Sequence, residues 1–453
     1  MAGLFGTDGV RARINTGPMT AEAVVRLALA AGRWFVDNNR EGRVGRPKVV
    51  IGKDTRLSGY MLESALVAGF SSIGMDCLLL GPLPTPAVAH LTNSLRADLG
   101  VIISASHNPH HDNGIKLFGP DGYKLDDEIE IAISELAAGS IALADAPDLG
   151  RARRMLDSVG RYVEFAKSSF PDDLRLDGMK IVVDCANGAA YRSAPDALSD
   201  LGAKVIPLFN EPDGYNINEG CGAVHPEVMA AAVVRHGAAV GIALDGDADR
   251  LILADETGHV LDGDQILACL AVAMKAAGTL TGDGVVGTVM SNRAFAGYLK
   301  CHGLALHRAR VGDRYILEMM RQTGINLGGE QSGHILITSL GTSGDGLVAA
   351  LQMLALLKRG EQPASQLFNA FTPSPQKLEN LRGLDPILLQ DEAVKADLGR
   401  IETKLGDAGR ILVRPSGTEA LIRVMVEADD DALLEATMAD IVLLLKEASR
   451  KNK

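Results

Sequence analysis

A serine lies at the centre of the first segment whose residues are suited to chemistry. Residues Ile103–Pro109 read ISASHNP, and we expect Val101–Ile103 to end a buried strand before small polar residues form an exposed turn. The Asn108-Pro109 pair ends any helical extension, because proline disfavours the helical region for the preceding residue. Ser106 on such a turn is well placed to attack or carry a phosphoryl group. The alternative is a polar turn in which Ser106 and His107 only hydrogen-bond the backbone.

Three aspartates alternate in the segment LDGDADR, residues Leu244–Arg250. We expect Gly237–Leu244 to form a buried strand that places Asp245, Asp247 and Asp249 at its carboxyl end. Carboxylates this close together repel one another unless a cation neutralises them, which favours a hard divalent metal such as Mg²⁺.

A calcium loop of the EF-hand type is the main alternative for the aspartate segment. Counted from Asp245, positions 1, 3 and 5 and the acidic position 12, Glu256, match that loop. Position 6 is Arg250, where the calcium loop needs glycine, and Leu251–Ala254 has the pattern of a strand. A metal site between two strands therefore fits better, and Arg250 beside it is suited to a phosphate.

The segment LGGEQSGH, residues Leu327–His334, has the composition of a sugar-binding loop. Its glycines permit close backbone approach, while Glu330, Ser332 and His334 offer a carboxylate, a hydroxyl and an imidazole. The alternative is an ordinary glycine-rich turn.

The segment VRPSGTE, residues Val413–Glu419, has the composition of a phosphate-binding loop. A guanidinium fork, two hydroxyls and a backbone amide suit a phosphate. These groups belong to Arg414, Ser416, Gly417 and Thr418, with Arg423 further along the next predicted strand. The alternative is a solvated hairpin turn.

A weak threefold pattern indicates the elements that position these segments. In each copy a β-branched run is followed by a helical stretch, a glycine and a second apolar run, which predicts a βαβ unit. The paired strands are expected at Lys48–Asp54 and Met75–Leu80, Lys180–Cys185 and Ala203–Phe209, and Val285–Met290 and Leu304–Ala309. The preceding glycines are Gly74, Gly202 and Gly303. The pattern predicts three related α/β domains with mixed sheets.

The last part of the chain has a different pattern. After Phe371–Pro375 we expect a loop-rich stretch, strands at Arg410–Val413 and Leu421–Glu427, and an amphipathic helix at Asp431–Ser449. This predicts a fourth, smaller α+β domain. The four expected domains are residues 1–155, 156–256, 257–370 and 371–453.

The overall composition limits the class of function. A chain of 453 residues is too long for one core, and its net charge of −12 argues against nucleic-acid binding, which needs a basic surface. No apolar stretch is long enough for a membrane span. The five cysteines are scattered without a CxxC pair, which indicates neither a disulfide framework nor a zinc knuckle. We expect a cytoplasmic protein.

Taken together, the motifs resemble the α-D-phosphohexomutase superfamily, and most closely its bacterial phosphoglucosamine mutases. Five segments match in family order and span the whole chain. They are FGTDGVR (Phe5–Arg11), SASHNP (Ser104–Pro109), DGDADR (Asp245–Arg250), GEQSGH (Gly329–His334) and RPSGTE (Arg414–Glu419). Two positions depart from the common pattern: Ala12 and Ala248 stand where glycine is frequent, and neither supplies side-chain chemistry.

The resemblance implies four domains around a central cleft and a phosphoserine at Ser106. It implies one Mg²⁺ held by Asp245, Asp247, Asp249 and a phosphoserine oxygen, with Arg250 and Arg11 near the phosphate. Lys116, on the predicted strand Ile115–Phe118, is the expected general acid or base, supported by His107.

The same resemblance implies a reaction and its partners. Phospho-Ser106 would convert glucosamine 6-phosphate into glucosamine 1-phosphate through glucosamine 1,6-bisphosphate, in a protein expected to be a homodimer. Glu330, Ser332 and His334 would bind the sugar, and the RPSGTE segment with Arg423 would bind the distal phosphate. The alternatives are the same chemistry on glucose or mannose phosphates, a non-catalytic phosphosugar-binding protein, and a phosphatase.

Overall fold

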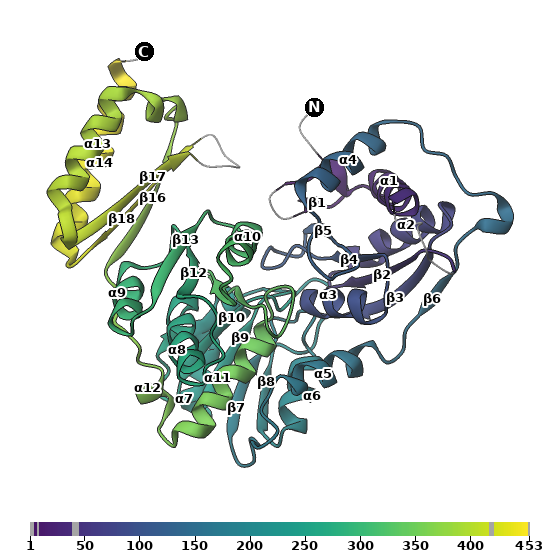
Figure 1. Ribbon diagram of the computed structural model, residues 1–453, viewed down its shortest axis with the longest axis horizontal. Coiled ribbons are helices and arrows are strands. Elements are labelled where there is room, and N and C mark those ends of the chain that lie inside the picture. The colour runs from purple at the N-terminus through teal and green to yellow at the C-terminus, as the bar shows by residue number, and fades with distance from the viewer. Residues whose placement is uncertain (1–3, 7–8, 39–44, 416–420, 452–453) are drawn as a thin grey trace.

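The computed structural model describes residues 4–6, 9–38, 45–415 and 421–451. In these ranges the chain forms four sheets, and we number the domains 1 to 4 by the sheet that each contains (Figure 1).

The sheets of domains 1 to 3 share one topology. The first strand pairs in parallel with the second on one side and the third on the other, and the fourth is antiparallel to the third. These strands are β2 (Lys48–Lys53), β3 (Asp76–Pro82), β4 (Leu99–Ile103) and β5 (Asp112–Phe118) in domain 1; β7 (Lys180–Asp184), β8 (Lys204–Leu208), β9 (Val240–Leu244) and β10 (Leu251–Asp255) in domain 2; and β12 (Gly284–Thr288), β13 (Ala305–Ala309), β14 (Leu327–Gly329) and β15 (Ile335–Ile337) in domain 3. The prediction of three related α/β domains with mixed sheets is confirmed.

Three short strands extend these sheets at their edges. β1 (Val10–Arg13) is antiparallel to β5, β6 (Ala152–Arg154) is parallel to β3, and β11 (Val260–Leu261) is antiparallel to β10. β1 matters for the site, because it places Arg11 opposite Gly114 of β5.

Helices connect the strands in each copy and cover the sheets. They are α1 (Ala21–Asn38), α2 (Ser58–Ser72), α3 (Thr85–Ser94) and α4 (Asp127–Ala138) in domain 1; α5 (Ser158–Ser168), α6 (Ser193–Asp200) and α7 (Pro226–His236) in domain 2; and α8 (Gly263–Ala276), α9 (Arg293–Cys301), α10 (Asp313–Thr323), α11 (Gly346–Gly360) and α12 (Ala364–Leu367) in domain 3. The repeated glycines adopt φ values of +89°, +97° and +65° at Gly74, Gly202 and Gly303. This left-handed region favours glycine, which explains its recurrence between each helix and the next strand.

Domain 4 is a three-stranded antiparallel sheet covered by two helices. Its elements are β16 (Gln376–Arg382), β17 (Gly409–Pro415), β18 (Leu421–Ala428), α13 (Glu392–Leu405) and α14 (Asp431–Lys451), with β18 central. The expectation of a loop-rich stretch after residue 375 was wrong, since β16 and α13 occupy it. Both lie at the periphery and bury few apolar side chains, so their hydrophobic pattern is weak.

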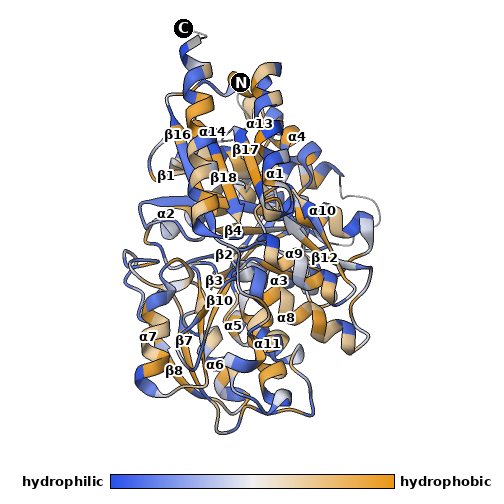
Figure 2. Cartoon of the chain, turned by 90° about the vertical axis from the view of Figure 1, so that its left-hand side faces the viewer, coloured by the Kyte–Doolittle hydropathy of each residue, from blue (hydrophilic) through white to orange (hydrophobic). Residues whose placement is uncertain are grey.

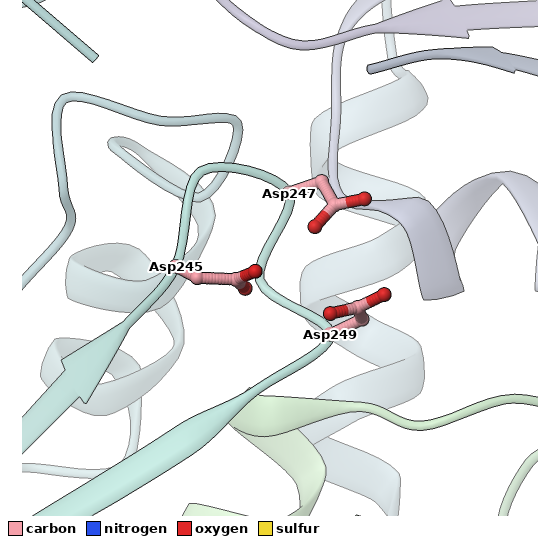
Figure 3. A group of neighbouring side chains, drawn as sticks. All are labelled: Asp245, Asp247 and Asp249. Atoms are coloured by element: carbon pink, nitrogen blue, oxygen red, sulfur yellow. The ribbon is translucent and has the colours of Figure 1, made fainter. Parts of the chain in front are cut away.

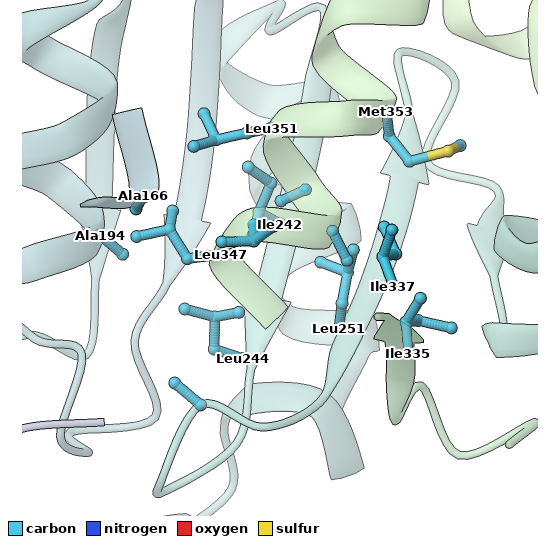
Figure 4. Close-up of a cluster of buried hydrophobic side chains, with 14 of the residues drawn as sticks. Ala166, Ala194, Ile242, Leu244, Leu251, Ile335, Ile337, Leu347, Leu351 and Met353 are labelled. Atoms are coloured by element: carbon cyan, nitrogen blue, oxygen red, sulfur yellow. The ribbon is translucent and has the colours of Figure 1, made fainter. Parts of the chain in front are cut away.

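Domains 1 to 3 are joined by a continuous apolar core. Helix α11 lies between the sheets of domains 2 and 3, where Leu347 and Leu351 pack among Ile242, Leu251 and Ile335 (Figure 4). The same cluster continues into domain 1, whereas domain 4 has a separate cluster between its sheet and its helices. Figure 2 shows apolar residues concentrated on strands and on one side of helices, and polar residues in the connecting loops.

Among the described residues, no helix combines the length and the apolar character that crossing a membrane requires.

Candidate active site

In each of domains 1 to 3, the motif with the candidate site residues lies in the same place of the shared topology. That place is the turn between the third and fourth strands. Ser106 lies between β4 and β5, the three aspartates between β9 and β10, and Glu330 to His334 between β14 and β15. The sequence pattern revealed the first two strands of each copy but not this equivalence. The strands β14 and β15 have only three residues each, too few for a periodic signal.

Backbone hydrogen bonds hold these turns together. Thr85 N at the start of α3 donates to Asp247 O at 2.9 Å, which joins domain 1 to the aspartate turn. Leu251 N donates to Gly333 O at 2.9 Å, and Gly346 N donates to Ala248 O at 3.0 Å. Segments distant in sequence are therefore fixed around one centre.

Ser106 is directed at the aspartate turn. Its Oγ donates a hydrogen bond to Asp245 Oδ2 at 2.6 Å, and its backbone N donates to Ser104 Oγ at 2.9 Å. The residue has a φ of +51°, a strained conformation for a side chain other than glycine. We expected an exposed turn, but Ser106 is only 1 % exposed, because domain 2 packs over it. The expectation of exposure was wrong.

The three aspartates converge on one point (Figure 3) and offer carboxylate oxygens within 4.8 Å of one another. All three are buried. Thr85 Oγ1 donates to Asp247 Oδ2 at 2.7 Å, but Asp247 Oδ1 and Asp249 Oδ1 accept no hydrogen bond in the described part of the chain. Burial, then the carboxylates of Asp249 and Asp247, raises the pKa of Asp245 to about 8. These features fit a hard divalent cation.

The calcium-loop alternative does not agree with this geometry. Strand β10 begins directly after Arg250, where an EF-hand loop would continue. Glu256, the would-be twelfth ligand, instead accepts a hydrogen bond from Ser365 N at 3.0 Å. Ala248, one of the two positions that depart from the resembled pattern, has a φ of +57°, in the left-handed region that favours glycine.

Two cationic side chains border the aspartates. Lys116 Nζ of β5 lies 3.1 Å from Asp247 Oδ2 and 3.3 Å from Asp249 Oδ2, in a position that is 2 % exposed. Arg250 Nε lies 4.0 Å from Asp245 Oδ2 and is buried without a hydrogen-bond partner in the described residues. The guanidinium of Arg250 is thus available for an anion beside Ser106.

His107 and Arg11 lie on the domain 1 side of the centre. His107 Nδ1 is 3.4 Å from Ser106 Oγ, and burial, then Arg250 and Arg11, lowers the pKa of His107 to about 4. The imidazole is therefore neutral at neutral pH. Arg11 Nη1 donates to Ala105 O at 3.5 Å, which places it against the same loop.

The turn of domain 3 divides into two parts. Glu330 Oε1 accepts from Gly312 N at 3.0 Å, and Ser332 Oγ donates to Glu330 Oε2 at 3.2 Å, so these two side chains are together. His334 is buried instead against the aspartates, with Nδ1 3.6 Å from Asp249 Oδ1. Burial disfavours its charged form, but Asp249 first, then Asp313 and Glu330, outweigh burial and raise the pKa of His334 to about 9.

Domain 4 contributes a pair of like charges. Arg414 of β17 is directly opposite Arg423 of β18, and burial, then Arg423, lowers the pKa of Arg414. Arg423 Nε is buried and donates no hydrogen bond within the described residues. Like charges opposite each other destabilise a sheet, so the pair fits a bound anion. Ser416, Gly417 and Thr418, the other predicted members, lie outside the described residues.

Sequence reasoning missed four polar residues that support the centre: Asp54, Arg56, Thr85 and Asn218. Thr85 holds Asp247, and the other three hold the Ser106 loop. They lie outside the five matched segments, and a single sequence gives no signal that a charged or polar residue is buried.

Family models match nearly the whole chain. The phosphoglucomutase/phosphomannomutase alpha/beta/alpha domains I, II and III match residues 2–141, 160–258 and 262–374, and the C-terminal domain matches residues 376–444.

Curated relatives are similar over their full length. The chain is 57% identical over 449 residues to the phosphoglucosamine mutase of Paracoccus denitrificans (strain Pd 1222), covering 98% of this chain and 99% of that protein. It is 55% identical over 451 residues to the phosphoglucosamine mutase of Paramagnetospirillum magneticum (strain ATCC 700264 / AMB-1), with 98% and 99% covered.

Solved structures share the fold. A phosphoglucomutase/phosphomannomutase family protein from Burkholderia thailandensis superposes with a TM-score of 0.82 at 25% identity, covering 98% of this chain and 97% of that one. Aspergillus fumigatus N-acetylphosphoglucosamine mutase, in complex with GlcNAc-6P and magnesium, gives a TM-score of 0.68 at 17% identity, covering 98% and 96%. The resemblance inferred from the five segments is confirmed, and the chain belongs to the phosphoglucosamine mutases of the α-D-phosphohexomutase superfamily.

Proposed function

We propose that this chain interconverts glucosamine 6-phosphate and glucosamine 1-phosphate, with Ser106 carrying the phosphoryl group. The observation that carries the proposal is the 2.6 Å contact between Ser106 Oγ and Asp245 Oδ2, at the edge of three buried carboxylates. The full-length similarity to proteins named phosphoglucosamine mutase supports the substrate.

Magnesium is the cofactor that best suits these residues. Asp245, Asp247 and Asp249 with a phospho-Ser106 oxygen would hold it, since oxygen ligands suit Mg²⁺ and two of the carboxylate oxygens accept no hydrogen bond from the residues that the structure describes. Bound there, the ion would neutralise phosphoryl charge and stabilise the charge that develops in the transition state.

The surrounding side chains would hold the phosphoryl group and move protons. Arg250 and Arg11 supply guanidinium groups for its outer oxygens. Lys116 Nζ lies between two carboxylates at the edge of the Ser106 site, so it is placed to give a proton to the serine oxygen as that oxygen leaves. His107, neutral beside Ser106 Oγ, is a second group able to accept a proton.

The ligand is bound at two further places. Glu330 and Ser332 would bind sugar hydroxyls, and His334, buried against Asp249, would hold the domain 3 turn against the metal site. Arg414 and Arg423, with Ser416, Gly417 and Thr418, would bind the phosphate that is not being transferred.

The cycle has two transfers. The bond between phosphorus and the Ser106 oxygen breaks as a bond to the free hydroxyl of glucosamine 6-phosphate forms, which gives glucosamine 1,6-bisphosphate. That hydroxyl loses its proton and the serine oxygen gains one. The bisphosphate then turns around and returns its other phosphoryl group to Ser106, releasing glucosamine 1-phosphate.

The test is a coupled assay with glucosamine 6-phosphate, Mg²⁺ and a trace of glucosamine 1,6-bisphosphate, together with intact-mass analysis. We expect glucosamine 1-phosphate and a phosphate adduct that maps to Ser106. Glucose and mannose phosphates are assayed in parallel, and turnover on those sugars alone would contradict the proposed substrate. Release of inorganic phosphate and free glucosamine, without glucosamine 1-phosphate, would indicate a phosphatase.

We further propose that the protein acts in the cytoplasm as a homodimer, as the family resemblance suggests. Light scattering after size-exclusion chromatography tests the dimer, and fractionation of the source cells tests the compartment.

A further inference from the structure

Arg56, which follows β2, is a fully buried arginine whose donors all meet backbone or carboxylate oxygens. The side chain is among the largest with less than 2 % exposure. Its Nη2 donates to Ser106 O at 2.9 Å and Asn108 O at 2.8 Å, and its Nη1 donates to Asp112 O at 3.2 Å and to Pro109 O. One guanidinium therefore donates hydrogen bonds to four carbonyls in and next to the loop that contains Ser106.

The loop needs such support because its central residue is strained. Ser106 has a φ of +51°, which costs about 1–3 kcal/mol in a residue other than glycine and persists only where the surroundings impose it. The carbonyl of Ser106 accepts from Arg56 and also from Asn218 Nδ2 at 2.8 Å. Gly246 lies so close that a Cβ there would be 2.6 Å from Ser106 O.

Asp54 binds the other side of the Arg56 guanidinium and links it to Ser104. Its Oδ2 accepts from Arg56 Nε at 2.8 Å and from Ser104 Oγ at 2.7 Å, while Ser104 Oγ accepts from Ser106 N at 2.9 Å. The carbonyl of Ser106 is thus held directly by Arg56, and its N–H is held through Ser104 and Asp54. Both sides of the strained residue depend on one ion pair.

A buried ion pair is a poor source of stability, since desolvation of both charges offsets their attraction. The contribution of this pair is geometric, because the planar guanidinium of Arg56 is a rigid fork whose donors point in several fixed directions. The carbonyls that it collects belong to the segment whose serine must meet both Asp245 and the sugar hydroxyl. Small displacements of a reacting group cost large factors in rate.

We propose that Arg56, with Asp54, is a positioning residue for phosphoryl transfer: it holds the backbone of Ser106 so that Oγ stays directed at Asp245. The inference rests on the proposed function and adds a residue to it that lies outside the five motif segments. Arg56 does not touch the substrate, so its replacement slows the transfer step and leaves the binding of the sugar phosphate intact.

The test compares Arg56→Lys with wild type. Lysine keeps the charge but not the planar fork, so kcat should fall by about 10²-fold, as for a reacting group misplaced by about 1 Å. KM for glucosamine 6-phosphate should stay within about threefold, because uniform binding is untouched. The double variant Asp54→Asn, Arg56→Met removes both charges together and should show the same loss of kcat.

Tyr162→Phe is the matched control for a purely structural effect. It removes a buried hydrogen bond to Asp345 Oδ1, 2.9 Å long, without touching the Ser106 loop. All variants are also followed by thermal unfolding. The control should unfold at lower temperature and keep wild-type kcat, whereas Arg56→Lys should lose kcat even at temperatures where it is fully folded.

The outcomes separate this inference from the proposed function. A wild-type enzyme without turnover on glucosamine 6-phosphate would overturn the function and this inference with it. An active wild type with an unchanged kcat in Arg56→Lys would overturn the inference alone, as would a rise in KM that accounts for the whole loss.

Discussion

The two ends of the proposed ligand site are built in opposite ways. The end at Ser106 lies where domains 1, 2 and 3 meet, above one continuous apolar core, and Ser106, Lys116 and the three aspartates are 5 % exposed or less. The end at Arg414 and Arg423 lies in domain 4, which has a core of its own. In Figure 1 domain 4 stands apart from domain 1 and continues from domain 3.

Beyond Phe371, which stacks on Phe295 of domain 3, domains 3 and 4 are joined by polar contacts. Arg410 Nη1 and Nη2 donate to Val289 O at 3.0 Å and Ser291 O at 3.1 Å, and Asn292 exchanges hydrogen bonds with Ser374. Polar contacts of this kind re-form readily in new positions, whereas an interdigitated apolar core does not.

The two ends also differ in the sign of their charge. The first has three carboxylates that need a cation, and the second has two cross-strand arginines that need an anion. The difference suggests a division of labour. In the proposed mechanism the chemistry takes place at a rigid centre, while the second end binds a phosphate from either orientation of the bisphosphate.

The largest expected effect comes from removing the proposed phosphoryl carrier at the rigid end. Ser106→Ala should lower kcat on the order of 10⁴-fold or more, because no other group can take its covalent role. Steady-state assays and intact mass measure the loss of turnover and of the phosphate adduct. Ser168→Ala, which removes an exposed hydroxyl on α5, is the control and should behave as wild type. Normal turnover in Ser106→Ala would refute the mechanism.

A smaller loss is expected when one of the proposed metal ligands is weakened. Asp247→Asn keeps the shape of the side chain but removes one charge, so the Mg²⁺ concentration for half-maximal activity should rise by more than about tenfold. Titration of activity with Mg²⁺ measures this. Asp255→Asn, at the far end of β10, is a buried aspartate outside the cluster and should leave the Mg²⁺ dependence unchanged. Equal Mg²⁺ curves for Asp247→Asn and wild type would exclude this residue as a ligand.

Loss of an arginine at the domain 4 end should raise KM and leave kcat unchanged. Arg423→Gln removes a charged hydrogen bond worth about 1.5–3 kcal/mol, so KM for glucosamine 6-phosphate should rise by about 10- to 100-fold. Its stability should increase by a few tenths of a kcal/mol, since a cross-strand repulsion of about 0.2–1 kcal/mol is relieved.

Kinetics and chemical unfolding test both halves of this prediction. Arg400→Gln, on the exposed face of α13, is the matched control for loss of one positive charge. A fall in kcat at constant KM would place Arg423 in the chemistry and not in phosphate binding.

Features of the fold and of the site that depend on local patterns could be predicted from the sequence, whereas those that depend on packing between domains could not. Short motifs predicted the residues of the candidate site, and the repeated strand–helix–glycine–strand pattern predicted the three α/β domains. The equivalence of the three turns was hidden, because strand pairing across distant residues leaves no periodic trace. The burial of Ser106 and the role of Arg56 depend on packing between domains, which a local pattern does not contain. The domain boundaries near 155, 256 and 370 stay predictions.

The smallest expected effect is a change of shape, because the polar contacts beyond Phe371 let domain 4 move while domains 1 to 3 stay fixed. We compare Ser106→Ala enzyme with Mg²⁺ and saturating glucosamine 6-phosphate against the same protein without the sugar, since this variant binds without turnover. The radius of gyration from small-angle scattering should decrease on binding, as Arg414 and Arg423 draw domain 4 toward the ligand. Adding Arg423→Gln to Ser106→Ala should weaken that decrease at the same ligand concentration. Identical scattering in every ligand state would mean that the two ends are equally rigid, and the bisphosphate would then have to turn around within an unchanging site.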